Sequence, residues 1–238
     1  MAGFFTDEPQ ISSGGYPWTP SLPAEYQKQY EESLLEKLPD LFFHSETAYR
    51  TRIRFWRLIT ELFAKRYTKQ VAGWCHENGL QLTGHLAYEK TMTGQLTANG
   101  TCMPQYACFD IPGIDWPGRR VSDCLTVLQA ASVAHQLGKR QILSESFAMC
   151  GWNVSFEELR RIAEYQMVHG VTLLCQHLAP YSLGVFASGM LRLRFLCSSH
   201  GGRNTAILTI SSAESECFSR WGTSISACLC CIPSNLPG

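Results

Sequence analysis

The chain lacks several features that would assign a protein to a class at once. Its 238 residues carry no net charge at pH 7, because 20 Lys and Arg balance 20 Asp and Glu. No basic excess favours a nucleic-acid partner, and no acidic run indicates a disordered tail. No apolar run approaches the roughly 20 residues that a bilayer-crossing helix needs, so we expect no membrane span.

The beginning of the chain lacks the pattern of a signal peptide. Met1–Asp7 contains neither a basic segment nor a long apolar one, and residues typical of a strand begin at Gly3. We therefore expect a piece from the interior of a longer protein. Many thiols without a disulfide pattern favour a cytoplasmic location.

Cysteines are abundant, but their spacing matches no zinc pattern. Six of the eleven precede residue 180, mostly inside apolar stretches, as around Cys175, which is typical of buried reduced thiols. Cys228, Cys230 and Cys231 could bind a soft metal, yet no second cysteine pair or histidine cluster accompanies them. A cysteine-rich metal-binding regulator is an alternative that would require zinc in the purified protein.

The periodicity of apolar residues predicts strands and helices in alternation. Short apolar strands separated by helices indicate a parallel sheet with right-handed crossovers. We expect a strand over residues 3–5, a loop to residue 23, helices over 24–38 and 46–76, strands over 80–86 and 106–111, a loop over 112–116, a helix over 122–137, a strand over 140–144, a helix over 155–168 and a strand over 171–177.

Polar side chains gather where these strands end. In a β/α barrel the functional groups lie at the carboxyl ends of the strands. A doubly wound sheet follows the same rule, but no glycine-rich phosphate loop follows any strand here. We therefore predict a β/α barrel whose site draws on Asp7, Glu8, His85, Asp115, Glu145 and His177.

Two of these groups, Glu8 and Glu145, could work as a catalytic pair. Two carboxylates from separate parallel strands can cleave a glycosidic bond, one protonating the leaving oxygen while the other activates water or attacks the sugar. For Glu8 the alternative is a surface carboxylate in a turn. Glu145 follows the apolar pair Ile142 and Leu143, and a carboxylate beside a buried strand is costly unless it is used or paired.

Five short segments carry a family resemblance: Gly79–His85, Ile111–Trp116, Ala134–Lys139, Leu143–Glu145 and Gln176–Leu178. Together they resemble bacterial glycoside hydrolases of the α-L-rhamnosidase type, over residues 3–183. The resemblance implies part of a (β/α)8 TIM barrel, approximately strands four to eight. Asp7-Glu8-Pro9 is similar to the Asn-Glu-Pro of the fourth strand in many barrel glycosidases, and Glu145 would then lie on the seventh.

On this resemblance Glu8 is the general acid and Glu145 the base that deprotonates water. The family inverts configuration, which calls for carboxyl groups ~6.5–9.5 Å apart, whereas a retaining enzyme needs ~5–5.5 Å. The sequence leaves the stereochemical outcome, the sugar and the linkage open.

Further side chains are candidates for binding a carbohydrate substrate, and each has a structural alternative. Histidines that end strands can be satisfied core groups, and tryptophans that stack on sugars can equally be buried. Glu89 and Asp115 could bind a cation such as calcium or be solvated loop residues. The substrate-binding candidates are Asp7, His85, Asp115, Trp116, Trp152 and His177.

The last part of the chain departs from the family pattern. Residues 1–183 are expected to form the barrel portion, and 184–238 an irregular tail derived from a frameshift, since a one-nucleotide shift permits the basic, proline-rich and tryptophan-rich continuation of the family. The alternative function is an inactive truncated fragment. Half-barrels expose strand edges, so self-association through those edges is expected.

Overall fold

The computed structural model describes residues 3–12, 14–121, 124–151 and 153–177, and it is mixed α/β. The chain divides into two compact units. The first contains residues 1–114 and 132–140, and the second contains residues 115–131 and 141–238. Strand β3 (Ile111–Trp116) begins in the first unit and ends in the second.

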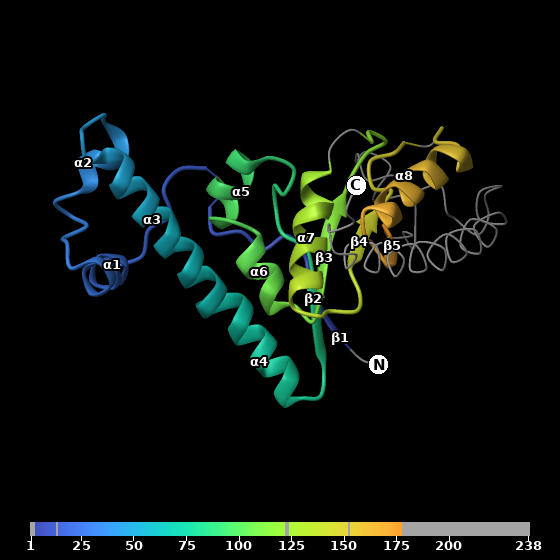
Figure 1. Cartoon of the computed structure of the whole chain (residues 1–238), viewed down its shortest axis with the longest axis horizontal. Coiled ribbons are helices and arrows are strands. Elements are labelled where there is room, and N and C mark those ends of the chain that lie inside the picture. The colour runs from blue at the N-terminus through green and yellow to red at the C-terminus, as the bar shows by residue number, and fades with distance from the viewer. Residues whose placement is uncertain (1–2, 13, 122–123, 152, 178–238) are drawn as a thin grey trace, which may run out of the picture. The chain divides into compact units, whose positions relative to one another are not determined.

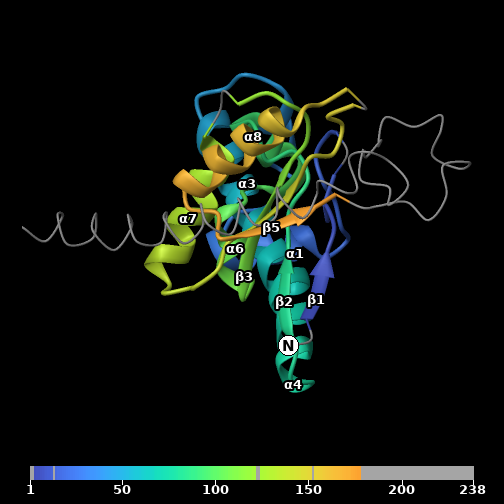
Figure 2. The same cartoon turned by 90° about the vertical axis from the view of Figure 1, so that its right-hand side faces the viewer.

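The first unit holds parallel strands in sequential order. β1 (Gly3–Thr6) pairs with β2 (Gln81–Gly84), and β2 pairs with β3. Figure 2 shows β1 and β2 side by side. The register places Thr6 opposite Gly84. Helices separate these strands along the chain, which confirms the predicted parallel arrangement with crossovers.

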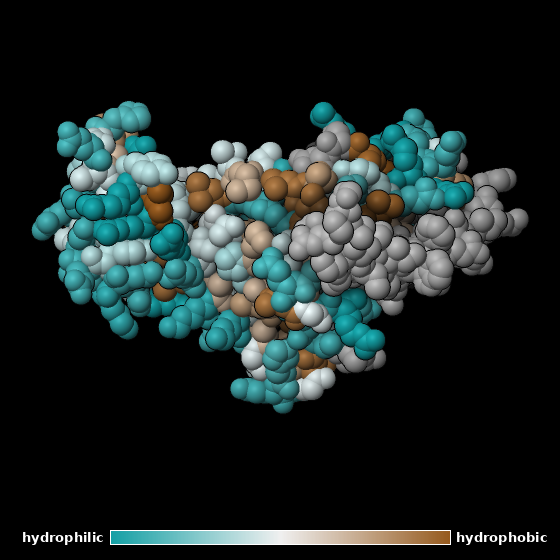
Figure 3. All heavy atoms as spheres, viewed as in Figure 1, coloured by the Kyte–Doolittle hydropathy of each residue, from teal (hydrophilic) through white to brown (hydrophobic). Residues whose placement is uncertain are grey.

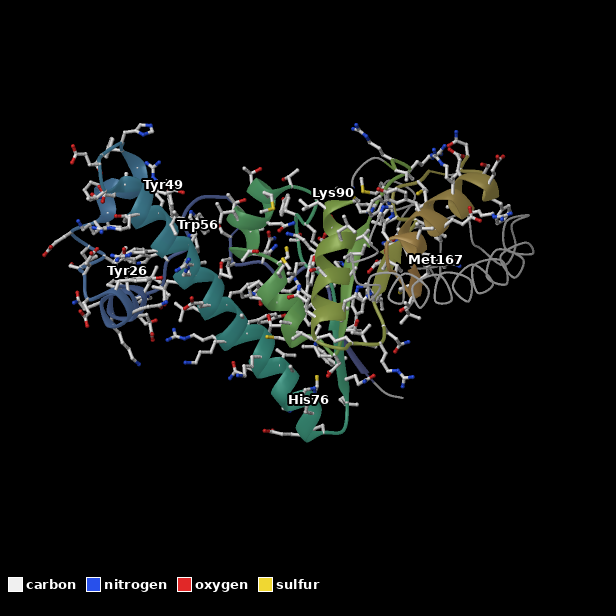
Figure 4. All side chains as sticks on the ribbon, viewed as in Figure 1. Tyr26, Tyr49, Trp56, His76, Lys90 and Met167 are labelled. Carbon is white, nitrogen blue, oxygen red and sulfur yellow. The ribbon has the colours of Figure 1, made fainter. Side chains whose placement is uncertain are left out.

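A long helical stretch connects β1 to β2 and runs without a break (Figure 1). It consists of α3 (Ala48–Phe63), a π-helical turn η1 (Ala64–Thr68) and α4 (Lys69–Glu77). Tyr49 lies near its beginning and His76 near its end (Figure 4). The apolar stripe predicted this helix, but not the π turn.

Two shorter helices pack on the first half of this stretch, α1 (Leu22–Tyr30) and α2 (Leu38–Phe42). The predicted helix over 24–38 is wrong in its second half, because Glu31 adopts a left-handed φ of 57° and ends α1. On the face drawn in Figure 3, hydrophilic side chains predominate over this helical region. Its core consists of Leu22, Tyr26, Leu34, Leu41, Phe55, Leu58 and Ile59.

The chain between β2 and β3 differs from the prediction. It forms α5 (Met92–Asn99) and α6 (Met103–Cys108), so the strand expected over 106–111 is wrong. The Thr91 hydroxyl caps α5 by accepting from the Gly94 N–H at 3.1 Å. Pro104 stands in the first turn of α6, where proline is favoured. β3 instead covers the expected loop.

The second unit contains the last two residues of β3, together with β4 (Leu143–Ser146) and β5 (Leu173–Gln176), which pair in parallel. Helix α7 (Leu125–Gln136) leads back into the first unit, and α8 (Phe156–Val168) precedes β5. A capping box of Ser155 and Glu158 begins α8, at the predicted start of this helix. β4 extends beyond its predicted end, so Glu145 lies within the strand instead of after it.

Some predictions fall outside the described residues, among them Trp152 and the tail over 184–238. The proposed boundary at residue 183 also lies there. Within the described residues, none of the helices is both long enough and apolar enough to cross a bilayer.

Candidate active site

Asp7 and Glu8 follow directly from the carboxyl end of β1. Glu8 has a φ of 44°, in the left-handed region that residues other than glycine seldom adopt. Such backbone strain costs about 1–3 kcal/mol and is concentrated at functional sites. The end of β1 therefore presents Glu8 in a backbone conformation that local preference alone would not select.

The Glu8 carboxyl group has a raised pKa. Partial desolvation is the larger cause, and the negative charge of neighbouring Asp7 is the second. A carboxylic acid that donates a proton near neutral pH needs a shift in this direction. Glu8 is thus the partly desolvated carboxyl group after β1, and exposed Asp7 supplies a negative charge beside it.

Asp7 pairs with His85, the residue that follows β2. Asp7 Oδ1 lies 3.1 Å from His85 Nε2. His85 is 1% exposed, whereas the Asp7 side chain is 77% exposed. Burial lowers the pKa of His85, and the Asp7 carboxylate counteracts part of that effect. The ring of Phe5 packs edge-on against the imidazole at 5.5 Å between centroids.

Gly84 makes this pairing possible. A Cβ at this position would lie 2.1 Å from the Thr6 carbonyl oxygen, and its φ of 145° is one that glycine tolerates. The His85 N–H donates to the Thr6 carbonyl at 3.3 Å. The close approach of Thr6 and Gly84 therefore brings the next residues of both strands together.

Two residues, Tyr67 and Glu89, make contacts near these strand ends that were not predicted from the sequence. The hydroxyl of Tyr67, in the π turn, lies 2.9 Å from Thr6 Oγ1. Glu89 is 3% exposed, and its Oε1 accepts from the Leu86 N–H at 2.9 Å and from the Tyr106 hydroxyl at 2.7 Å. The sequence carried no signal for either partner, because both contacts join distant segments or depend on the loop conformation.

Glu89 is thus a buried carboxylate and not a solvated loop residue. Calcium takes carboxylate and carbonyl oxygens, so Glu89 and Asp115 are chemically suitable ligands. Oε1 of Glu89 is already engaged in two hydrogen bonds. Calcium binding stays a prediction.

In the second unit, Glu145 and His177 come together. Glu145 Oε1 lies 3.8 Å from His177 Nε2, and the two side chains are 15% and 14% exposed. Their strands are neighbours, and the His177 N–H donates to the Ser146 carbonyl at 2.8 Å. This side of β4 therefore carries a largely buried carboxylate with an imidazole beside it.

Ser144 and Ser146 point the other way, toward α8. The Ser144 hydroxyl donates to Gln166 Oε1, and Gln166 Nε2 donates to Ser146 Oγ at 3.1 Å. All three residues are fully buried. Because side chains alternate along a strand, this network fixes Glu145 on the opposite face of β4.

The remaining described candidates, Asp115 and Trp116, lie in β3. Trp116 is 5% exposed and packs against Tyr165 of α8, with ring centroids 5.7 Å apart, a core position. Asp115 is half-buried in β3. Substrate binding by Asp115, Trp116 and Trp152 stays a prediction.

Two known proteins are similar to this chain. No protein-family model matches the chain. A putative beta-glucuronidase of Formosa agariphila is 28% identical over 166 residues, covering 67% of this chain and 13% of the relative. The structure of a rhamnosidase from Novosphingobium sp. PP1Y superposes with a TM-score of 0.72 at 21% identity, covering 92% of this chain and 22% of that one.

Both similar proteins carry the names of glycoside hydrolases, which agrees with the resemblance found in the sequence. The fold is that of part of the Novosphingobium rhamnosidase. The chain spans 22% of that protein's length and 13% of the curated relative's length.

Proposed function

We propose that the chain is the part of a rhamnosidase-like β/α barrel that carries both catalytic carboxylates. Strands β1 to β5 would then correspond to strands four to eight of the complete barrel. The observation that best supports this is Glu8, which follows the end of a parallel strand. Its backbone is strained and the pKa of its carboxyl group is raised, in a fold shared with a rhamnosidase.

Glu8 acts as the general acid in this proposal and donates its proton to the oxygen of the leaving group. Partial desolvation and, as the smaller effect, the negative charge of Asp7 favour the protonated form of Glu8, and Asp7 is itself oriented by His85. His85 is buried with a lowered pKa, so it serves near neutral pH as a neutral hydrogen-bonding group.

Glu145 acts as the base. It would remove a proton from the attacking water, and His177 at 3.8 Å would stabilise its carboxylate form. The network of Ser144, Ser146 and Gln166 holds β4 so that Glu145 keeps its orientation. The resembled family predicts inversion, so the first product would carry the opposite anomeric configuration.

Turnover of activated glycosides by the full chain tests this proposal. The substrates are the 4-nitrophenyl glycosides of α-L-rhamnose and β-D-glucuronic acid, chosen from the names of the two similar proteins. The variants are Glu8→Gln, Glu145→Gln and, as a matched control, Glu36→Gln at an exposed position.

We expect wild type and Glu36→Gln to turn over one of the substrates equally. Glu8→Gln and Glu145→Gln should each lose about 10²–10⁴-fold in kcat, the usual contribution of a general acid or base. Equal activity of all four proteins would remove both residues from the mechanism.

An inactive fragment is the second candidate, because the chain covers only 22% and 13% of the two matched proteins. A folded wild-type chain that cleaves neither glycoside would favour this alternative over the proposal.

A further inference from the structure

The loop after β2 is held in a conformation that it would not adopt by itself. It begins with His85 and ends at Thr91, the cap of α5. Tyr88, in its middle, has a left-handed φ of 56°. A non-glycine residue in this region is strained and persists only where surrounding contacts determine the backbone.

The Glu89 side chain supplies those contacts from inside the loop. Its Oε1 accepts from the Leu86 N–H at 2.9 Å, so the carboxylate ties down the peptide group that directly follows His85. Its own carbonyl accepts from Gln95 Nε2 at 2.6 Å, which fastens the loop to α5. The loop is therefore fixed at both ends by Glu89.

Tyr106 anchors this carboxylate from α6. Its hydroxyl donates to Glu89 Oε1 at 2.7 Å, and the Tyr106 side chain is 0% exposed. Hydrogen bonds to a charged group are stronger than those between neutral groups. These two bonds therefore favour the loop conformation in which Tyr88 is strained.

We propose that Glu89 is a positioning residue of the candidate site, which, anchored by Tyr106, holds the loop after β2 so that His85 meets Asp7. Glu89 makes no contact with substrate in this account. It acts through the Leu86 peptide on His85, whose Nε2 lies 3.1 Å from Asp7 Oδ1. The inference rests on the proposed function only for its effect on turnover.

The NMR signals of the His85 ring in the full-length chain test the inference without requiring activity. Asp7→Ala, which removes the oxygen that His85 Nε2 contacts, defines the direction in which the signals move when the pair is lost. We expect Glu89→Gln to move them in that direction, and Tyr106→Phe to do so by a smaller amount. Glu36→Gln should leave them at the wild-type positions.

A folded Glu89→Gln variant whose His85 signals coincide with those of wild type would overturn the inference. If that variant does not fold, Tyr106→Phe decides in the same way, because it removes only the hydroxyl that donates to Glu89. Where the chain is active, both variants should lower kcat by about 10-fold and leave KM within about 2-fold, as loss of a supporting contact does. An inactive wild type contradicts the proposed function, while the His85 signals still test Glu89.

Discussion

At the scale of single residues, the candidate site depends on backbone conformations that few side chains tolerate. Glu8 and Tyr88 adopt left-handed φ values, and Gly84 allows the ends of β1 and β2 to approach. These positions bring Asp7 to His85. The chemistry at the strand ends is therefore specified by backbone geometry as much as by the reactive groups.

Replacing Gly84 by alanine should destabilise the first unit strongly. The added Cβ would lie 2.1 Å from the Thr6 carbonyl oxygen, at a φ of 145°. We expect a loss of more than about 3 kcal/mol in the free energy of unfolding, measured by urea denaturation.

Gly79→Ala is the matched control for this substitution. Gly79 also has a positive φ, 68°, but nothing lies within 4 Å of an added Cβ. It should cost only about 1 kcal/mol. An equal loss in both variants would mean that the contact with Thr6 is unimportant.

The sequence signals for candidate site residues are local. Polar residues at the predicted strand ends indicated the candidates Asp7, Glu8, His85, Glu145 and His177. The sequence could not reveal that Asp7 contacts His85 or that Glu145 contacts His177, because both contacts depend on strand register.

At the scale of elements, the junction between α2 and α3 is held by one carboxylate. Asp40 accepts from the hydroxyls of Ser45 at 2.6 Å, and of Thr47 and Thr51, both at 2.8 Å. These hydrogen bonds lower the pKa of Asp40 to about 2, with the Ser45 bond as the largest cause.

This junction should lose stability in acid. Because the pKa of Asp40 is lower in the folded chain than its ordinary value of 3.8, its contribution is complete above pH 3.8 and is lost as the pH falls toward 2. We expect Asp40→Asn to have a lower Tm than wild type at pH 6, with the difference shrinking between pH 4 and about 2. A Tm difference that does not vary with pH would contradict this, and Glu36→Gln is the control.

The elements between β2 and β4 were predicted least well. Pro112 and Gly113 are poor strand residues, so the segment they occupy was expected to be a loop, yet it forms β3. Helices α5 and α6 lie where a loop and a strand were expected. Helices with strong apolar stripes or capping boxes, such as α3 and α8, were predicted well because their signals are local.

At the scale of the whole molecule, exposed strand edges predict self-association. β1 is the outermost strand of the described sheet in its unit, and it exposes Phe4 by 48% and Phe5 by 38%. An edge strand with apolar side chains is a template for pairing with another chain. Phe4→Lys should therefore shift the sedimentation profile toward the monomer.

Phe43→Lys is the control for this effect, since Phe43 is 70% exposed but follows α2, away from any strand. A wild-type chain that is monomeric at all concentrations would contradict the prediction, as would equal effects of the two variants.

If Glu8 donates the proton to the leaving group, the rate of the Glu8→Gln variant should depend strongly on how readily that group leaves. The measurement compares wild type and Glu8→Gln on the phenyl and 2,4-dinitrophenyl glycosides of the sugar that the chain cleaves. A phenolate that leaves readily needs no acid. We expect Glu8→Gln to lose about 10²–10⁴-fold in kcat on the phenyl glycoside and to keep a near wild-type kcat on the dinitrophenyl glycoside. Equal losses on both would contradict it.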